Sequence, residues 1–350
     1  MLCAMNLYTI YQNTIVNLPN GYNSLLMNPN DVSNKCKCEE FILNIITQFR
    51  KNKMSCSKYV EQLSQERLSH VVSCFLMGYY LYTEVYKKKG WLNSDFFEKM
   101  DMFYGKSSDE FDFLFLWALT CLYHDVGYVY EEGKRCALAD FSILDEKDKP
   151  EDFPSIYNLA NICLYEQLRR ENCRKLDHGI YGALRLRRDF DELLKEGHPK
   201  TQTPNKAYNC AVWSIMCHNI WFKSPKDNCY KAKGLHSLVL DDAREKVKIC
   251  ESPFLYLLSL ADNLEPYKKV KDIELWKSIS FEIRDSSCLK VDFGDTLKHN
   301  KNTEEKIDEV KAYWKSIKGL NDWLVKVEPQ DESLIISLTV YIAENKKTIK

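Results

Sequence analysis

The sequence predicts a mainly helical protein with a small α+β segment near its C-terminal end. Glycine and proline are scarce, at 12 and 10 of 350 residues, and this favours long helices over a turn-rich β architecture. Along most of the chain, apolar residues recur at steps of about three or four, which places them on one face of a helix. After about residue 271, apolar and polar residues alternate instead, as is typical of strands.

Several apolar segments have the spacing of helices. Residues 57–88 are expected to form one long helix with His70 in its middle. Residues 111–123 are apolar on almost all sides, which predicts a central, buried helix, and Gly127 is the expected cap at its end. The expected helices cover residues 38–50, 57–88, 111–123 and 154–171, and further helices begin at Asp177, Thr203 and Ser252.

These patterns divide the chain into three regions. Residues 1–56 are expected to form an N-terminal helical extension, residues 57–271 a helical domain, and residues 272–350 a β-β-α-β-β appendage. The strands of the appendage are expected at residues 278–284, 289–293, 324–328 and 334–341, with a polar helix at residues 304–315.

The composition is that of a globular protein without a strong charge bias. Hydrophobic residues make up 45% and charged residues 28% of the chain, and the net charge of −1 gives no basic field for long nucleic acids. No run of about 18 apolar residues occurs, so no membrane span is expected. The 14 cysteines are scattered without a C-x-x-C pair, which indicates reduced thiols in a cytoplasmic protein.

Six side chains that can bind metal stand at the ends or in the centres of the apolar helices. They are His70, His124, Asp125, His178, His218 and Asp262. Helices of this length, packed side by side, would bring these groups to one level of a bundle. Imidazole and carboxylate together suit ions such as Fe, Mn, Zn or Ni. Six groups are too many for one tetrahedral site but fit two ions that share a carboxylate, for which Asp125 is the natural bridge.

The residues around these groups form a recognisable set of motifs. The set reads Arg67-x-x-His70, His124-Asp125-x-Gly127, His178-Gly179-x-x-Gly182-Ala183, an apolar helix that ends in His218, and Leu257-Leu258-x-Leu260-Ala261-Asp262. In this order it resembles the HD-domain metal-dependent phosphohydrolase superfamily, over about residues 57–268. The resemblance implies an HD-type helical bundle. It also implies the two-metal branch of the superfamily, because both middle histidines are present.

The resemblance further implies hydrolysis of a phosphate ester or anhydride, with a nucleotide as the expected substrate. One ion would be held by His70, His124, Asp125 and Asp262, and the second by Asp125, His178 and His218. The cofactors would be two divalent transition-metal ions, Fe, Mn, Ni, Co or Zn, and Mg is also compatible. A hydroxide that bridges the ions would attack the phosphorus atom. Asp177 would orient a neighbouring ligand imidazole.

The residue that follows the H-D-x-G motif departs from the family. Many members have a lysine there, whereas this chain has Tyr128, which can hydrogen-bond a phosphate or pack against its neighbours. Arg67 lies one turn before His70 on the same helix face and is the expected catalytic cation beside His124 and Asp125. Other cations that can meet a phosphate are Arg185, Arg188, Lys268 and Lys269, although the two arginines also suit a solvated helix face.

Two other functions stay open. Some two-iron members of the superfamily activate O₂, and the same ligands would serve such an oxygenase; phosphate release without O₂ would count against it. A nucleotide-binding sensor would bind its ligand tightly without turnover. The expected partner of the hydrolase is a small phosphorylated molecule, and the oligomeric state stays open, with a homo-oligomer as one form.

Overall fold

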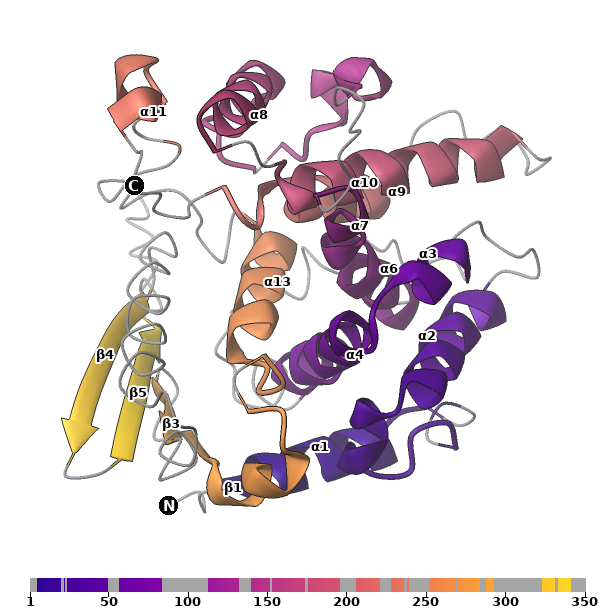
Figure 1. Ribbon diagram of the computed structural model, residues 1–350, viewed down its shortest axis with the longest axis vertical. Helices are drawn as coiled ribbons and strands as arrows, with labels where there is room; N and C mark the ends of the chain where they lie inside the picture. The colour runs from indigo at the N-terminus through magenta and orange to yellow at the C-terminus, as the bar shows by residue number, and fades with distance from the viewer. Residues whose placement is uncertain are drawn as a thin grey trace, which may run out of the picture.

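The computed structural model describes a helical body, a β-sheet and several of their connections. Helices make up most of the described chain, which confirms the predicted mainly α class (Figure 1). The described residues are 5–19, 22, 24–49, 57–83, 113–131, 140–151, 153–173, 176–195, 206–220, 228–235, 238, 252–268, 270–283, 288–292, 323–330 and 333–340.

The helices follow most of the predicted segments. They are α1 (Leu7–Val16), α2 (Lys35–Phe49), α3 (Ser57–Gln62), α4 (Gln65–Tyr80), α6 (Phe113–Val126), α7 (Tyr128–Glu131), α8 (Leu159–Cys173), α9 (His178–Lys195), α10 (Lys206–Cys217), α11 (Asn228–Ala232) and α13 (Pro253–Leu264). Short 3-10 turns occur at Pro29–Ser33, Phe141–Ile143, Glu146–Asp148 and Ile273–Ser278.

Two predicted helix boundaries are wrong for local reasons. The single helix expected at residues 57–88 is interrupted between α3 and α4, because Ser64 has an extended backbone and caps α4 with a hydrogen bond from the Arg67 N–H at 3.3 Å. The helix expected at residues 154–171 begins later, at α8. Asn158 caps it instead, since its side-chain oxygen accepts the Asn161 N–H at 2.9 Å.

The cap at Ser64 leads to a stability prediction. Ser64→Ala removes the acceptor for the Arg67 N–H, so the free energy of unfolding is expected to fall by about 1 kcal/mol. Urea unfolding followed by circular dichroism measures this change. Ser64→Asn, which keeps a capping oxygen, is expected to stay close to the wild type. An alanine variant as stable as the wild type would contradict the assigned cap.

Helices α4, α6, α9, α10 and α13 form the centre of the fold. Helix α6 packs against α4, α9 and α10, and α13 packs against α4 and α10 (Figure 1). Every side chain from Leu114 to Val126 is buried, which confirms the predicted central position of this segment. These helices share one continuous hydrophobic core, and Trp117 and Trp213 are among its largest fully buried side chains. The ends of several apolar helices therefore meet inside the protein.

The strands form one antiparallel sheet with the order β1-β2-β3-β5-β4. Four of them lie close to the predicted positions, while the helix expected at residues 304–315 lies outside the described residues. Strand β1 was not predicted. It pairs Met5 with Phe281, so the N-terminal segment joins the sheet of the C-terminal region. The strands are β1 (Met5–Asn6), β2 (Ser280–Ile283), β3 (Cys288–Asp292), β4 (Trp323–Gln330) and β5 (Ser333–Val340).

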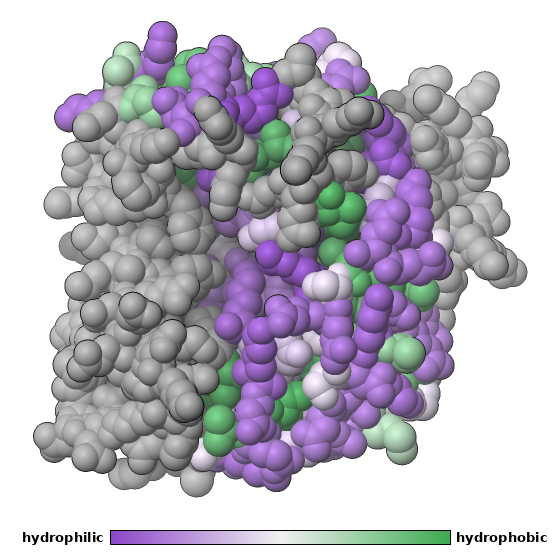
Figure 2. Space-filling model, viewed as in Figure 1, coloured by the Kyte–Doolittle hydropathy of each residue, from purple (hydrophilic) through white to green (hydrophobic). Residues whose placement is uncertain are grey.

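The described surface is mostly polar. On the face drawn in Figure 2, hydrophilic residues dominate the coloured area and hydrophobic residues form small separate areas. Among the residues that the structure describes, the exposed large hydrophobic side chains belong to the N-terminal segment: Met5, Val16 and Met27. None of the described helices is long and apolar enough to cross a membrane.

Candidate metal centre

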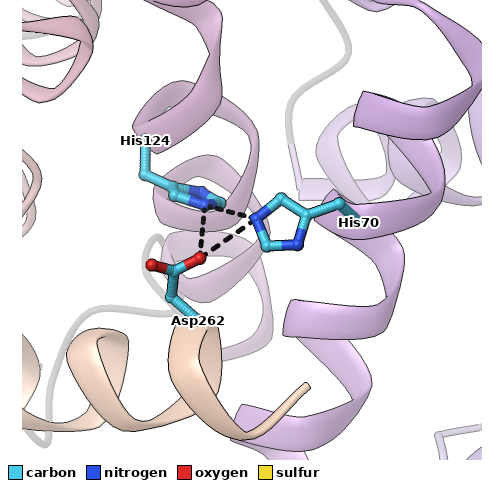
Figure 3. Close-up of side chains that lie close together, drawn as sticks. All are labelled: His70, His124 and Asp262. Atoms are coloured by element: carbon cyan, nitrogen blue, oxygen red, sulfur yellow. Dashed lines mark hydrogen bonds and ion pairs between the residues drawn. The ribbon is translucent and has the colours of Figure 1, made fainter. Parts of the chain in front are cut away.

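Three of the predicted metal ligands meet in the buried centre of the helical body (Figure 3). His70 comes from the middle of α4, His124 from the last turn of α6, and Asp262 from the last turn of α13. The Nε2 atom of His70 lies 3.1 Å from both Nε2 of His124 and Oδ1 of Asp262. Nε2 of His124 lies 3.6 Å from the same Oδ1 atom. Their ligand atoms lie within 4.8 Å of one another, so one ion could contact all three residues.

Asp125 adds a fourth member to this group. Its carboxylate is fully buried and lies 3.7 Å from Nε2 of His70 and 3.5 Å from Nε2 of His124. Neither carboxylate oxygen has a hydrogen-bond partner. Burial alone would raise the pKa of Asp125, but the nearby His124, His70, Lys268 and Arg67 hold it well below its usual value. One cation already lies beside it, because Nη1 of Arg67 is 3.5 Å from Oδ2. A buried, ionised carboxylate with one ion pair and no hydrogen bond still favours a further cation, so the site fits a metal ion.

The two middle histidines extend this group into a row of four imidazoles. His178 is the first residue of α9, and His218 directly follows α10. The ring centroids lie 5.2 Å apart for His70–His124, 5.3 Å for His124–His218 and 5.3 Å for His218–His178. His178 has an additional neighbour that was not predicted, since Nδ2 of Asn219 contacts both of its ring nitrogens, Nδ1 at 3.2 Å.

Backbone carbonyl groups fix the orientation of two of these rings. Nδ1 of His124 donates to the Cys121 carbonyl oxygen at 2.6 Å, and Nδ1 of His218 donates to that of Ile215 at 2.6 Å. In the neutral form of either ring, the opposite nitrogen, Nε2, then carries the lone pair. In His218 this buried Nε2 atom has no hydrogen-bond partner. Burial, followed by His124, lowers the pKa of His218 to about 4, so the ring is neutral, as metal binding requires.

Glycines allow the helices that carry the histidines to approach closely. A Cβ atom at Gly127 would lie 1.8 Å from the His178 carbonyl oxygen, and one at Gly182 would lie 1.9 Å from that of Tyr123. Gly234 is the one glycine with a positive φ among the described residues. Gly127 directly follows the last residue of α6, where the cap was expected, but without a positive φ. Glycine is needed at this position for the close approach of α6 and α9.

Arg67 and Tyr128 form a stack beside Asp125. The guanidinium carbon of Arg67 lies 3.4 Å from the centroid of the Tyr128 ring, and this ring stacks on His178 with centroids 3.8 Å apart. Nη1 of Arg67 is 3.5 Å from Oδ2 of Asp125. Burial and the charge of Asp125 raise the pKa of Tyr128 to about 12, so its hydroxyl stays protonated and can donate a hydrogen bond.

The other predicted cations have different positions. Nζ of Lys268 lies 2.5 Å from Oδ1 of Asp262, at the edge of the metal centre. Arg185 instead contacts the hydroxyl of Tyr59 and lies 3.6 Å from Asp189. Arg188 lies 4.0 Å from Asp140. Lys269 is outside the described residues. A substrate role for Arg185, Arg188 and Lys269 stays a prediction.

Asp177 caps α9. Its Oδ1 atom accepts the Gly179 N–H at 2.9 Å, and Oδ2 accepts the Tyr165 hydroxyl at 3.0 Å. This carboxylate therefore holds the helix that begins with His178, instead of orienting an imidazole as expected. Behind it lies the buried Glu166, whose Oε2 atom accepts the Asp177 N–H at 3.1 Å.

Glu166 leads to a prediction about pH. Burial and the charge of Asp177 raise its pKa from 4.5 to about 8. Between these values the folded protein keeps a proton that the unfolded chain has released, so stability is expected to fall as the pH rises. In metal-free protein, the wild type should lose about 1 kcal/mol per pH unit relative to Glu166→Gln between pH 5 and 8. Urea unfolding at several pH values tests this, and parallel curves for the two proteins would contradict it.

The buried centre thus combines imidazole and carboxylate ligands from several helices. Donor sets of this kind suit Fe, Mn, Ni, Co or Zn better than they suit Ca. Sequence reasoning missed Asn219 and a further buried acid, Glu265, whose Oε1 atom lies 3.0 Å from Nδ1 of His70. A signal for Glu265 was present, because it follows Asp262 by one helical turn. No protein-family model, curated protein or solved structure matches this chain.

Proposed function

We propose that this chain is a metal-dependent phosphohydrolase of the HD type, which cleaves a phosphate ester or anhydride of a nucleotide. The observation that carries the proposal is the buried carboxylate of Asp125. It lies within 3.7 Å of two histidine Nε2 atoms, and its oxygens have no hydrogen-bond partner beside the 3.5 Å ion pair with Arg67. The order of the ligand motifs along the chain, which resembles the HD superfamily, supports the same proposal.

The proposed ligands divide between two ions. Divalent ions bound there would supply a nucleophilic water at neutral pH and would polarise a phosphoryl oxygen. The ligand atoms of His70, His124 and Asp262 lie within 4.8 Å of one another, which supports one ion. The Nε2 atom of His218 has no hydrogen-bond partner and its ring lies next to His124, which supports the second ion. The first ion would be held by His70, His124, Asp125 and Asp262, and the second by Asp125, His178 and His218.

The proposed substrate contacts come from the groups at the rim. The side chain of Arg67 is 30% exposed, so its guanidinium can be reached from solvent and can bind a phosphate oxygen. The protonated hydroxyl of Tyr128 can donate a second hydrogen bond. Lys268, whose side chain is 32% exposed, adds a positive charge on the Asp262 side. Together these groups would stabilise the negative charge that develops on the phosphoryl oxygens.

A substrate screen tests the proposed activity. Metal-free protein is supplied with Mn, Fe, Co, Ni, Zn or Mg and incubated with nucleoside triphosphates, dinucleoside polyphosphates, alarmones and cyclic nucleotides, without O₂. Chromatography then measures the products. We expect hydrolysis of at least one class, with loss of activity when a chelator is added. If no class is cleaved with any of the ions, the proposed hydrolase activity is wrong.

A further inference from the structure

Glu265 occupies a fixed position directly after α13. Its side chain is fully buried, and Pro266 follows it and prevents the helix from continuing. Oε2 accepts the Tyr267 N–H at 2.8 Å, and Oε1 accepts the Lys268 N–H at 3.0 Å. Two backbone hydrogen bonds therefore hold this carboxylate in one orientation.

The same carboxylate faces the edge of His70 that is turned away from the metal centre. Oε1 lies 3.0 Å from Nδ1 of His70, an ion-pair contact in which Nδ1 does not meet the angle of a hydrogen bond, while Nε2 on the other side of the ring lies 3.1 Å from Oδ1 of Asp262. The imidazole thus stands between two carboxylates. In His124 and His218 the corresponding contact is a neutral backbone carbonyl, so His70 is the histidine whose outer partner carries a charge.

A carboxylate next to one ring nitrogen has two effects on a metal ligand. When an ion binds the other nitrogen, the carboxylate favours the one remaining proton on the nitrogen beside it. It also increases the basicity of the ligand and fixes the plane of the ring. Partners of this type typically change metal affinity by about 10–100-fold when they are removed.

We propose that Glu265 is a positioning residue of the metal centre, which holds His70 with its proton on Nδ1 and with Nε2 directed at the ion. This inference rests on the proposed metal site and adds a residue that acts on the ion through His70. Glu265 contacts neither the proposed ion nor the substrate. Glu265 lies one turn after Asp262 in the chain and contacts His70 through its side chain. It therefore connects His70 and Asp262, two proposed ligands of the same ion.

Metal affinity provides the first test. Binding of Mn²⁺ and Zn²⁺ to the metal-free full-length chain is measured by calorimetry for the wild type, Glu265→Gln and Asp189→Asn. Asp189 is the matched control, because it is a buried acid that accepts the Tyr123 hydroxyl and lies 3.6 Å from Arg185. We expect Glu265→Gln to bind about 10–100-fold more weakly and the control to bind like the wild type. Glu265→Gln that binds like the wild type overturns the inference.

A second measurement does not depend on whether Glu265→Gln folds. Long-range ¹H–¹⁵N spectra of the Zn²⁺-loaded wild type show which nitrogen of each histidine carries a proton, and His70→Gln assigns the His70 signals. We expect His70 to be protonated at Nδ1; a proton on Nε2 overturns the inference even if Glu265→Gln does not fold. Wild-type protein that binds no metal ion overturns the metal site itself, so this failure is distinct from failure of the Glu265 inference alone.

Discussion

Asp125→Asn is expected to lose its metal and to release product more than about a hundredfold more slowly than the wild type. Removing a group that only orients a ligand already lowers activity by about 10–100-fold, and Asp125 is proposed to bind both ions directly. Asparagine has the same shape but no charge. It therefore leaves two imidazoles, His70 and His124, without the negative charge that lies 3.5–3.7 Å from them.

Metal content measured by mass spectrometry separates this effect from misfolding. Asp189→Asn changes a buried carboxylate on α9 that accepts the Tyr123 hydroxyl and is not a proposed ligand, so it is expected to keep a wild-type metal content. Wild-type protein purified without a chelator should contain at least one transition ion per chain. Asp125→Asn that retains this ion and turns over product at the wild-type rate would remove the central role assigned to Asp125.

The helical class could be predicted because its signals are local. Apolar residues at helical spacing identify α6, and the near absence of polar positions before His124 identifies it as central. The interruption at Ser64 was missed, since the apolar pattern continues through it and the cap depends on one backbone conformation. Strand β1 could not be predicted, because its two residues pair with β2, which lies far away in the sequence.

The candidate ligands could be predicted for a related reason. A histidine or aspartate at the buried end of an apolar helix needs a partner, and this need is visible in the sequence. The partners themselves depend on how the helices cross. Arg185, on the basic face of α9, contacts Tyr59 and Asp189 instead of the metal centre. Asn219 gains its contact with His178 from packing between helices that no local pattern specifies. Glu265 had a local signal, its position one turn after Asp262, but its contact with His70 also depends on how α4 and α13 pack.

Gly182→Ala is expected to destabilise the protein by about 3 kcal/mol or more and to weaken metal binding. Alanine normally stabilises a helix by about 1 kcal/mol relative to glycine, so the predicted effect has the opposite sign to helix propensity. The reason is that the added Cβ atom would lie 1.9 Å from the Tyr123 carbonyl oxygen, which belongs to the backbone and cannot rotate away. Helices α6 and α9 must then separate, and His124 moves away from His178.

Gly234→Ala provides the contrast for this prediction. Gly234 has a φ of 77° and no atom within 4 Å of the position of an added Cβ atom. Its substitution is expected to cost about 1–2 kcal/mol through backbone strain and to leave metal affinity unchanged. Urea unfolding and Zn²⁺ calorimetry on both variants measure the two effects separately. Equal metal affinities in the wild type and Gly182→Ala would mean that the spacing of α6 and α9 does not determine the geometry of the metal centre.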